Sequence, residues 1–327
     1  MRDFSYARAG FVAEARKAAA DPAVMLLAGG TTLLDLAKCG VAEPERIVDI
    51  SHLHDLDAIT FDDAGVVIGA LAKMSHVADD AGIQARFPAV SQALWQAASA
   101  QLRNMATIGG NLMQRTRCPY FRDPANYPAC NKRSPGSGCS AIGGVTRGHA
   151  VLGTSEACIA TYPGDLAIAL VAFDAELHLG ERSLKLEDFF LAPGATAERE
   201  HDIRPGEVIT GIEIPASAAA RRSTYIKVRD RQSYEFAAAS AAVGLELESD
   251  GRTIRDIRVA LGGVATRPWR ARAVEEALKG KPLDETLVRE ACELAMQGAV
   301  DHGANHYKIA LGPRVAARAI LKLGETA

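Results

Sequence analysis

The chain has 327 residues, 48% of them hydrophobic and 24% charged, which is an ordinary globular composition and a length sufficient for two domains. The formal net charge is −3 and no long basic run occurs, so nucleic acid and anionic membranes are poor candidates as partners. No apolar stretch reaches transmembrane length, which argues against a membrane-spanning protein.

The first fifty residues predict a small β-α-β unit with a glycine-rich first turn. Apolar spacing indicates a helix over 8–20, followed by a short strand over 24–28. Thr32 and Asp35 fit a capping box, so a second helix is expected to begin there. A second strand is predicted over 46–50. The charges scattered through this N-terminal segment are not typical of a secretory signal.

The middle of the chain alternates strand-like and helical patterns. A hairpin is predicted over 57–72, because turn residues lie between two apolar runs. Pro88 is expected to open a helix that continues to Ala100. Strand-like apolar runs follow over 157–161 and 167–179.

The last third of the chain predicts a separate lobe. The stretch 191–222 is rich in Ala, Pro, Gly and charged residues, so a domain boundary is expected near its end. Three antiparallel strands are predicted over 225–229, 236–247 and 253–264. Helices are predicted over 270–279, 283–299 and 313–323. The whole chain is therefore expected to be an α+β protein.

Two short motifs combine paired glycines with threonine: AGGTTLLD at 28–35 and ATIGGN at 106–111. Glycine lets the backbone approach a ligand closely and adopt positive φ, and the amides of a helix N-terminus favour an anion. One such turn alone needs no ligand, but two of them favour the grip of one pyrophosphate from two sides. A third pattern, GSGCSA at 136–141, matches a dinucleotide fingerprint but follows turn residues instead of a strand, and we reject it.

Half of the six cysteines lie in one irregular loop, RCPYFRDPANYPACNKRSPGSGC, at 117–139. With a cysteine that follows, the loop supplies four candidate ligands: Cys118, Cys130, Cys139 and Cys158. Four thiolates suit either a cubane iron–sulfur cluster or a structural zinc, and the spacing alone leaves the two near even. Basic residues near these thiols are expected to lower the thiol pKa: Arg115, Arg117, Lys132 and Arg133. His149 could replace a thiolate, but we favour Cys158 as fourth ligand and a hydrogen-bonded loop histidine.

Four stretches in order carry a resemblance: AGGTTLLD, QLRNMATIGGN, Asp165 in PGDLAIAL and Lys227 in YIKVRDR. Over essentially its whole length the chain resembles the flavin subunit of the molybdenum hydroxylases, the family of xanthine dehydrogenase, aldehyde oxidoreductase and carbon monoxide dehydrogenase. The cysteine-rich insertion over 115–158 looks most like that of bacterial periplasmic aldehyde oxidoreductases, whose flavin subunit carries an extra [4Fe–4S] cluster.

The resemblance implies a division of the chain into two domains. A two-lobed FAD-binding domain of the vanillyl-alcohol-oxidase/PCMH type would cover 1–218, with a small β-α-β lobe over 1–55 and a larger lobe over 56–218. A C-terminal domain over 219–327, as in carbon monoxide dehydrogenase flavoprotein subunits, would hold a three-stranded antiparallel sheet and about three helices.

The resemblance also implies the cofactor contacts. FAD would be bound by the two glycine turns and by two residues near its ribityl and ring end: Leu27, Ala28, Gly29, Gly30, Thr31, Thr32, Leu33, Leu34, Thr107, Gly109, Gly110, Asn111, Asp165 and Lys227. The four cysteines named above would hold the [4Fe–4S] cluster. Without the resemblance, Asp165 would be interpreted as a helix cap and Lys227 as an exposed strand lysine.

The implied function is electron transfer within a heterotrimer. A large molybdenum-cofactor subunit would oxidise an aldehyde to a carboxylic acid, and a small [2Fe–2S] subunit would pass the electrons to FAD on this chain. The external acceptor stays open between oxygen, a quinone-linked carrier, ferredoxin and NAD. No nucleophile–base triad or carboxylate pair is needed, and none is found in the sequence.

Three alternatives stay open at this point. The chain could serve a reductive enzyme that is similar to 4-hydroxybenzoyl-CoA reductase, or it could be a zinc-stabilised interaction module without flavin. A free-standing flavoenzyme of the same FAD fold is the third, and it would leave the cysteine insertion unexplained. By resemblance we expect export to the periplasm with a signal-bearing partner subunit, and a cytoplasmic location if no such partner exists.

Overall fold

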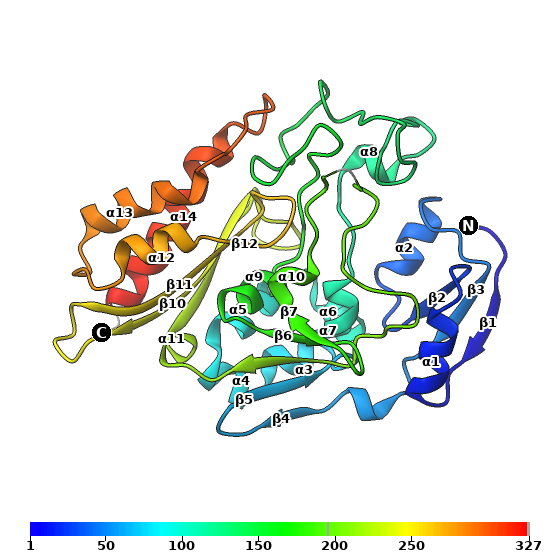
Figure 1. Cartoon of the computed structure of the whole chain (residues 1–327), viewed down its shortest axis with the longest axis horizontal. Coiled ribbons are helices and arrows are strands. Elements are labelled where there is room, and N and C mark those ends of the chain that lie inside the picture. The colour runs from blue at the N-terminus through cyan, green and yellow to red at the C-terminus, as the bar shows by residue number, and fades with distance from the viewer. Residues whose placement is uncertain (195, 326–327) are drawn as a thin grey trace.

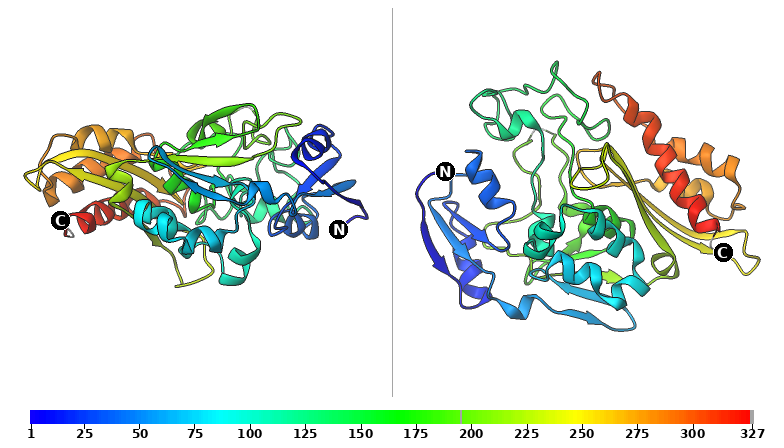
Figure 2. Two further views of the ribbon diagram at one scale, coloured as in Figure 1. Left: turned by 90° about the horizontal axis from the view of Figure 1, so that it is seen from below. Right: turned by 180° about the vertical axis from the view of Figure 1, so that it is seen from behind.

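The computed structural model describes residues 1–194 and 196–325. The strands form three sheets, which follow one another along the molecule as three lobes (Figure 1). The N-terminal lobe lies at one end, and the C-terminal sheet with its helices lies at the other (Figure 1). The larger lobe and the cysteine-bearing insertion lie between them, and two further views show the same order (Figure 2). The expected α+β class is confirmed.

The N-terminal lobe is a three-stranded parallel sheet in the order β1-β3-β2. Its elements are β1 (Ser5–Arg8), α1 (Val12–Ala19), β2 (Val24–Leu27), α2 (Leu33–Lys38) and β3 (Arg46–Asp49). The predicted β-α-β unit is confirmed, but the helix predicted over 8–20 begins four residues later. Strand β1 escapes prediction because three of its four residues are exposed, so it shows no apolar alternation.

The predicted capping box at the start of α2 is wrong. Thr32 precedes the helix but makes no side-chain capping hydrogen bond. The Asp35 carboxylate instead accepts hydrogen bonds from Arg117 and Arg122, which lie on the cysteine-bearing insertion. A long-range pair of charges has therefore replaced the local cap that the sequence pattern indicates.

The larger lobe contains a five-stranded sheet in the order β4-β5-β8-β6-β7, in which all pairs are antiparallel. Its strands are β4 (Ile59–Phe61), β5 (Gly65–Gly69), β6 (Glu176–His178), β7 (Ser183–Lys185) and β8 (Gly211–Pro215). The hairpin predicted over 57–72 is confirmed as β4 and β5. Buried residues of β5 and β8 pack with α3, α5 and α9 in the largest hydrophobic core.

Ten short helical segments surround this sheet or lie in its connections. They are η1 (His54–Leu56), α3 (Met74–Asp79), α4 (Ala81–Arg86), α5 (Pro88–Gln96), α6 (Ala100–Met105), α7 (Ile108–Leu112), α8 (Pro119–Arg122), α9 (Leu166–Ala172), α10 (Leu186–Phe189) and α11 (Ala218–Arg221), the last of which leads into the C-terminal lobe. Helix α5 begins at Pro88 as predicted but ends at Gln96, because Ala98 adopts a positive φ of 49° and Ser99 caps a new helix.

Both strands predicted after the insertion need correction. Residues 166–172 form helix α9, and the predicted strand over 167–179 survives only as the three residues of β6. All seven residues of α9 are buried, so the helix has no polar face and its sequence reads as an unbroken apolar run. Residues 157–161 are irregular, and their apolar side chains pack against the insertion without joining a sheet.

The C-terminal lobe is a four-stranded antiparallel sheet in the order β12-β11-β10-β9, not the three strands predicted. The fourth strand has only two residues, too few for any periodic signal. The elements are β9 (Ser223–Val228), β10 (Ala239–Leu247), β11 (Ile254–Gly262), β12 (Trp269–Arg270), α12 (Arg272–Leu278), α13 (Glu285–Glu293), η2 (Leu294–Met296) and α14 (Tyr307–Glu325). Residues of all three α-helices share one core with the sheet.

Strand β9 joins the C-terminal lobe to the larger lobe through buried polar contacts. The Gln92 Oε1 atom of α5 accepts hydrogen bonds from the Tyr225 amide at 2.8 Å and from the Thr224 hydroxyl at 3.0 Å. Asp165, which precedes α9, accepts from the Tyr225 hydroxyl at 2.6 Å and from Lys227 Nζ at 2.8 Å. The side chains of Lys227 and Asp165 are only 1% and 5% exposed, so this ion pair is shielded from water.

We expect the substitution Asp165→Asn to destabilise the protein by about 3–5 kcal/mol, because it leaves the Lys227 charge buried without its partner. Adding Lys227→Met should recover part of this loss, since the double variant buries no unpaired charge. The free energy of unfolding in urea measures both effects. The matched control is Glu285→Gln, which breaks an exposed pair with Arg289 on α13 and should change little. Equal effects at the two sites would contradict the role assigned to the buried pair.

Candidate cofactor sites

The first glycine turn connects β2 to α2 and leaves a row of backbone amides without protein acceptors. Among the residues that the structure describes, no protein group accepts from the amides of Gly29, Gly30, Thr31 and Thr32. Gly30 has a φ of +73°, which a glycine adopts without strain. Helix α2 has only six residues, so the free amides contribute more to anion binding than the dipole of so short a helix does.

The two glycine turns touch each other through their backbones. A Cβ atom on Gly29 would lie 2.1 Å from the carbonyl oxygen of Met105 and 3.0 Å from Cα of Ala106. Ala106 opens the second motif, so only a glycine at position 29 allows the N-terminal lobe to approach the larger lobe this closely. The sequence analysis assigns both motifs to one ligand, and the structure brings them together.

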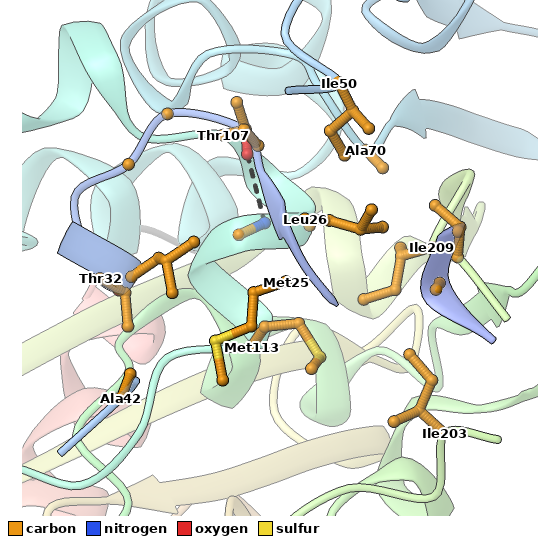
Figure 3. Close-up of a pocket in the computed structure, with 18 of the residues that line it drawn as sticks. Met25, Leu26, Thr32, Ala42, Ile50, Ala70, Thr107, Met113, Ile203 and Ile209 are labelled. Carbon is orange, nitrogen blue, oxygen red and sulfur yellow. Dashed lines mark hydrogen bonds between the residues drawn. The ribbon is translucent and has the colours of Figure 1, made fainter. Parts of the chain in front are cut away.

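The second turn differs from the first, because its amides already donate to protein oxygens. Thr107 caps α7, and its Oγ1 atom accepts a hydrogen bond from the Gly110 amide at 3.2 Å (Figure 3). The amides of Ile108, Gly109 and Asn111 also donate to protein oxygens. This turn therefore offers side chains instead of amides, and the buried Asn111 Oδ1 atom has no partner among the described residues.

The turns enclose a cavity of about 560 Å³, a size typical of cofactor sites. Of the predicted FAD contacts, those that line it are Ala28, Gly29, Gly30, Thr31, Thr32, Leu33, Thr107, Gly109 and Gly110. Its apolar wall is formed by side chains from the N-terminal lobe and the larger lobe, among them Leu26, Ile50, Met113 and Ile209 (Figure 3). The sequence analysis missed these wall residues, because single apolar residues in separate segments carry no motif.

Five predicted FAD contacts lie outside the cavity wall. Leu27 and Leu34 pack against Gly30: a Cβ atom on Gly30 would lie 3.2 Å from Leu34 Cδ1 and 3.3 Å from Leu27 Cδ1. Asn111 follows the lining residue Gly110 but does not line the cavity itself. Asp165 and Lys227 bind each other at the boundary with the C-terminal lobe. Their predicted contact with the flavin ring stays a prediction.

The four candidate cysteines converge on one small cavity in the insertion. Cys118, Cys130, Cys139 and Cys158 all line it, and every cysteine of the chain has a free thiol. Cys118 is central, because it contacts three separate hydrophobic clusters. One contains Cys130, one is also contacted by Cys139, and one contains Cys158. Cys130 and Cys139 also face each other in an isolated antiparallel bridge. These residues, which are far apart in the sequence, therefore lie close together in the fold.

Ion pairs hold the insertion on both sides of the cysteines. Glu200, whose side chain is 16% exposed, pairs with Arg115 and, at 3.1 Å, with Lys132 Nζ. Burial opposes the charge on Glu200, but Lys132 and Arg115 outweigh it and lower the pKa of this carboxyl. The side chain of Arg133 donates to three backbone carbonyls of the insertion. The basic residues thus act mainly as structural ties.

The expectation that these basic residues lower the thiol pKa is wrong for two of the cysteines. Burial raises the pKa of the Cys118 thiol to about 12. Burial also raises the pKa of Cys158, although the Lys132 charge acts in the opposite direction. The positive charges are largely neutralised by Glu200 and Asp35, so desolvation dominates.

The geometry of the cysteines bears on which metal group they fit. Within the described residues, no group of three or more His, Cys, Asp or Glu side chains is placed to hold a single metal ion. One zinc ion, with Zn–S bonds of about 2.3 Å, needs four sulfurs within about 3.8 Å of each other. A cubane cluster carries its four thiolates on separate iron atoms and spreads them more widely. The four thiols lie around one cavity, and the choice between a zinc ion and a cluster stays open at this point.

Comparison with known protein families assigns two consecutive parts of the chain to families. Residues 2–217 match the family described as FAD binding domain in molybdopterin dehydrogenase, and residues 224–323 match the carbon monoxide dehydrogenase flavoprotein C-terminal domain. Taken with the glycine turns and their cavity, this defines an FAD-binding subunit of an oxidoreductase.

Individual relatives agree with this class. The chain is 44% identical over 285 residues to the FAD-binding subunit PaoB of the Escherichia coli (strain K12) aldehyde oxidoreductase, covering 85% of this chain and 86% of that one. It is 30% identical to the glyceraldehyde dehydrogenase medium chain of Sulfolobus acidocaldarius, covering 88% and 85% of the two chains. The chain therefore belongs to the FAD-binding subunits of the molybdenum hydroxylase family.

Solved structures share the fold over nearly the whole chain. Carbon monoxide dehydrogenase from Hydrogenophaga pseudoflava superposes with a TM-score of 0.76 at 26% identity, covering 99% of this chain and 98% of that one. Quinoline 2-oxidoreductase from Pseudomonas putida 86 has the same fold, with a TM-score of 0.75 at 24% identity over 100% and 98% of the two chains. Among the described helices, none combines the length and the apolar character needed to cross a bilayer.

We expect Gly29→Ala to weaken FAD binding by at least tenfold, because the new Cβ would overlap the Met105 carbonyl and push the two glycine turns apart. Overpacking of this kind costs about 1–3 kcal/mol, and 1.4 kcal/mol corresponds to a factor of ten in affinity. Flavin fluorescence titration of the apoprotein measures the dissociation constant. Gly148→Ala is the control, because nothing lies within 4 Å of its Cβ position. An unchanged FAD affinity in Gly29→Ala would refute this placement of the cofactor.

Proposed function

We propose that this chain is the FAD- and [4Fe–4S]-containing electron-transfer subunit of a molybdenum-dependent aldehyde oxidoreductase. The observation that carries the proposal is the convergence of Cys118, Cys130, Cys139 and Cys158 on one cavity within a chain of the FAD-binding family. FAD accepts electrons in pairs or singly, and an iron–sulfur cluster exchanges them one at a time, so the two groups together suit electron transfer.

The first glycine turn would hold the FAD pyrophosphate through its unpaired amides. Four free amides in a row match the negative charge of a pyrophosphate, as in other backbone anion sites. The Thr107 hydroxyl, which lines the cavity, would contact the cofactor from the second turn. Leu26, Ile50, Met113 and Ile209 would enclose the less polar parts of FAD and keep water out (Figure 3).

Each cysteine would contribute one thiolate to the [4Fe–4S] cluster. The thiol pKa of about 12 at Cys118 makes a free thiolate unfavourable there, so binding to iron would release the proton at assembly. Lys132, with its side chain 8% exposed beside Cys158, offsets negative charge at this site. A zinc-stabilised module without flavin is less favoured, because residues 2–217 match an FAD-binding family.

The partners would be a small [2Fe–2S] subunit and a large molybdenum-cofactor subunit in a heterotrimer. The names of the relatives, "subunit" and "medium chain", describe proteins that work with other chains. The aldehyde substrate is inferred from PaoB and from the Sulfolobus relative, whose names both give an aldehyde-oxidising activity. Electrons would leave FAD for an external acceptor, and export with a signal-bearing partner would place the complex in the periplasm.

Two measurements separate this proposal from its rivals. The first is an absorption spectrum of anaerobically purified protein, with flavin, iron, acid-labile sulfide and zinc quantified. We expect one FAD with about four iron and four sulfide per chain, the content of one cubane cluster. FAD without iron would remove the cluster from the proposal, and zinc without flavin would favour the interaction module.

The second measurement gives the direction of electron flow and uses the copurified complex. An aldehyde should bleach the flavin absorbance, whereas the alternative related to 4-hydroxybenzoyl-CoA reductase requires reduced cofactors to be reoxidised by an aromatic acyl-CoA. Flavin that responds to neither compound would overturn both assignments of substrate.

We expect Cys130→Ser to lower iron and sulfide to less than about half of the native content, because one of four thiolates is lost. FAD should decrease much less, since the glycine turns are unchanged. The control is Cys39→Ser, which removes a partly exposed thiol outside the set of four. Equal loss of iron in the two variants, or none in either, would contradict the assignment of the cluster ligands.

A further inference from the structure

His149 lies beside the candidate cluster ligands without being one of the four. It belongs to the segment between Cys139 and Cys158, and it is only 2% exposed. Its Nε2 atom lies 3.2 Å from Cys118 Sγ. Its other ring nitrogen, Nδ1, is buried and has no partner among the described residues. Among the described residues, the Cys118 sulfur is the side-chain partner of this imidazole.

We propose that His149 donates an N–H···S hydrogen bond to the Cys118 sulfur and thereby sets the reduction potential of the cluster which that sulfur holds. The inference rests on the proposed function, because it requires the cluster to be present. His149 would be a positioning residue: it bonds iron at no atom and acts through the sulfur of its neighbour.

The direction of the hydrogen bond follows from the chemistry of the two partners. A thiolate bound to iron carries no proton and can only accept, so the nitrogen that faces it must carry the hydrogen. A neutral imidazole has one N–H, which places the hydrogen on Nε2 and leaves Nδ1 as a bare lone pair. The Nε2 atom, which lies 3.2 Å from the sulfur, is therefore the donor.

The C-terminal lobe fixes the position of His149. Asn305, which is fully buried, donates through Nδ2 to the Ala150 carbonyl at 2.8 Å and to the His149 carbonyl at 3.5 Å. Thr146 donates through its hydroxyl to the His302 carbonyl at 2.8 Å, and its own carbonyl accepts from the His149 amide at 2.8 Å. The imidazole is therefore held against the sulfur by contacts that do not involve the sulfur, as a pre-organised donor requires.

The expected effect is on the cluster potential. Reduction adds one negative charge to the cluster, and part of this charge lies on the thiolate sulfurs. An N–H that points at a sulfur stabilises the reduced state more than the oxidised state, so it raises the potential. Loss of the donor should lower the equilibrium constant for one-electron reduction about tenfold, which corresponds to a shift of about 59 mV to more negative potential.

The test compares three variants of the full chain, purified anaerobically with the subunits that copurify. His149→Phe keeps a planar ring but removes the N–H, and His149→Gln returns an amide N–H at a similar reach. The control Tyr120→Phe removes a hydroxyl whose oxygen accepts from the Val145 amide at 2.6 Å, in the same loop and beside the same ring. The readouts are iron content, the potential of the cluster by EPR-monitored titration, and exchangeable-proton couplings of the reduced cluster in D₂O.

We expect the more negative potential and the loss of one exchangeable-proton coupling only in His149→Phe, with iron near the native content in all three variants. Full iron with an unchanged potential in His149→Phe would overturn this inference and leave the proposed function intact. Loss of iron in both His149 variants, but not in Tyr120→Phe, would also overturn it, because His149 would then be needed to hold the cluster. Native protein with FAD but without iron would overturn both the cluster and this inference.

Discussion

Two arginines of the insertion bind one carboxylate of helix α2, and this contact joins the two candidate cofactor sites. Arg117 and Arg122 both donate to Asp35 Oδ2. Asp35 lies on the helix that begins where the unpaired amides of the first glycine turn end. Next to this pair, the fully buried Phe121 packs against Leu36 of the same helix. The helix that lines the cavity of the glycine turns therefore also packs against the insertion that carries the cysteines.

The other buried charges also form ion pairs that join separate segments of the chain. Glu200 neutralises Arg115, which lines the cavity of the glycine turns, and Lys132, which lines the cavity of the cysteines. Asp165 and Lys227 satisfy each other at the boundary between the lobes. A buried charge without its partner costs several kcal/mol, so each of these groups restricts how its two segments can sit. The positively charged residues near the thiols therefore fix the geometry of the insertion more than they promote ionisation of the thiols.

The sequence predicts well those features that are encoded locally. Paired glycines in AGGTTLLD mark a turn with free amides, and a hairpin with Asp62 and Gly65 at its turn forms as expected. Prediction fails where distant contacts decide. Helix α9 is apolar on every side and imitates a strand, and Thr32 loses its capping role because distant arginines take Asp35.

The four cysteines predicted as ligands, Cys158 among them, are brought together by contacts that the spacing along the chain does not encode. The insertion has no single core. Cys118 contacts a separate small cluster with each of the other three cysteines, and these clusters include Leu36 of α2 and Ala197 of the larger lobe. A loop that depends partly on contacts with its neighbours would gain further order if four thiolates bound one group, since metal binding would then contribute to folding. Because Leu36 of α2 packs with Phe121 and Cys130, the proposed binding at the cysteines would also stabilise the helix next to the first glycine turn. The insertion is thus a structural support of the FAD cavity as well as the proposed site of an iron–sulfur cluster.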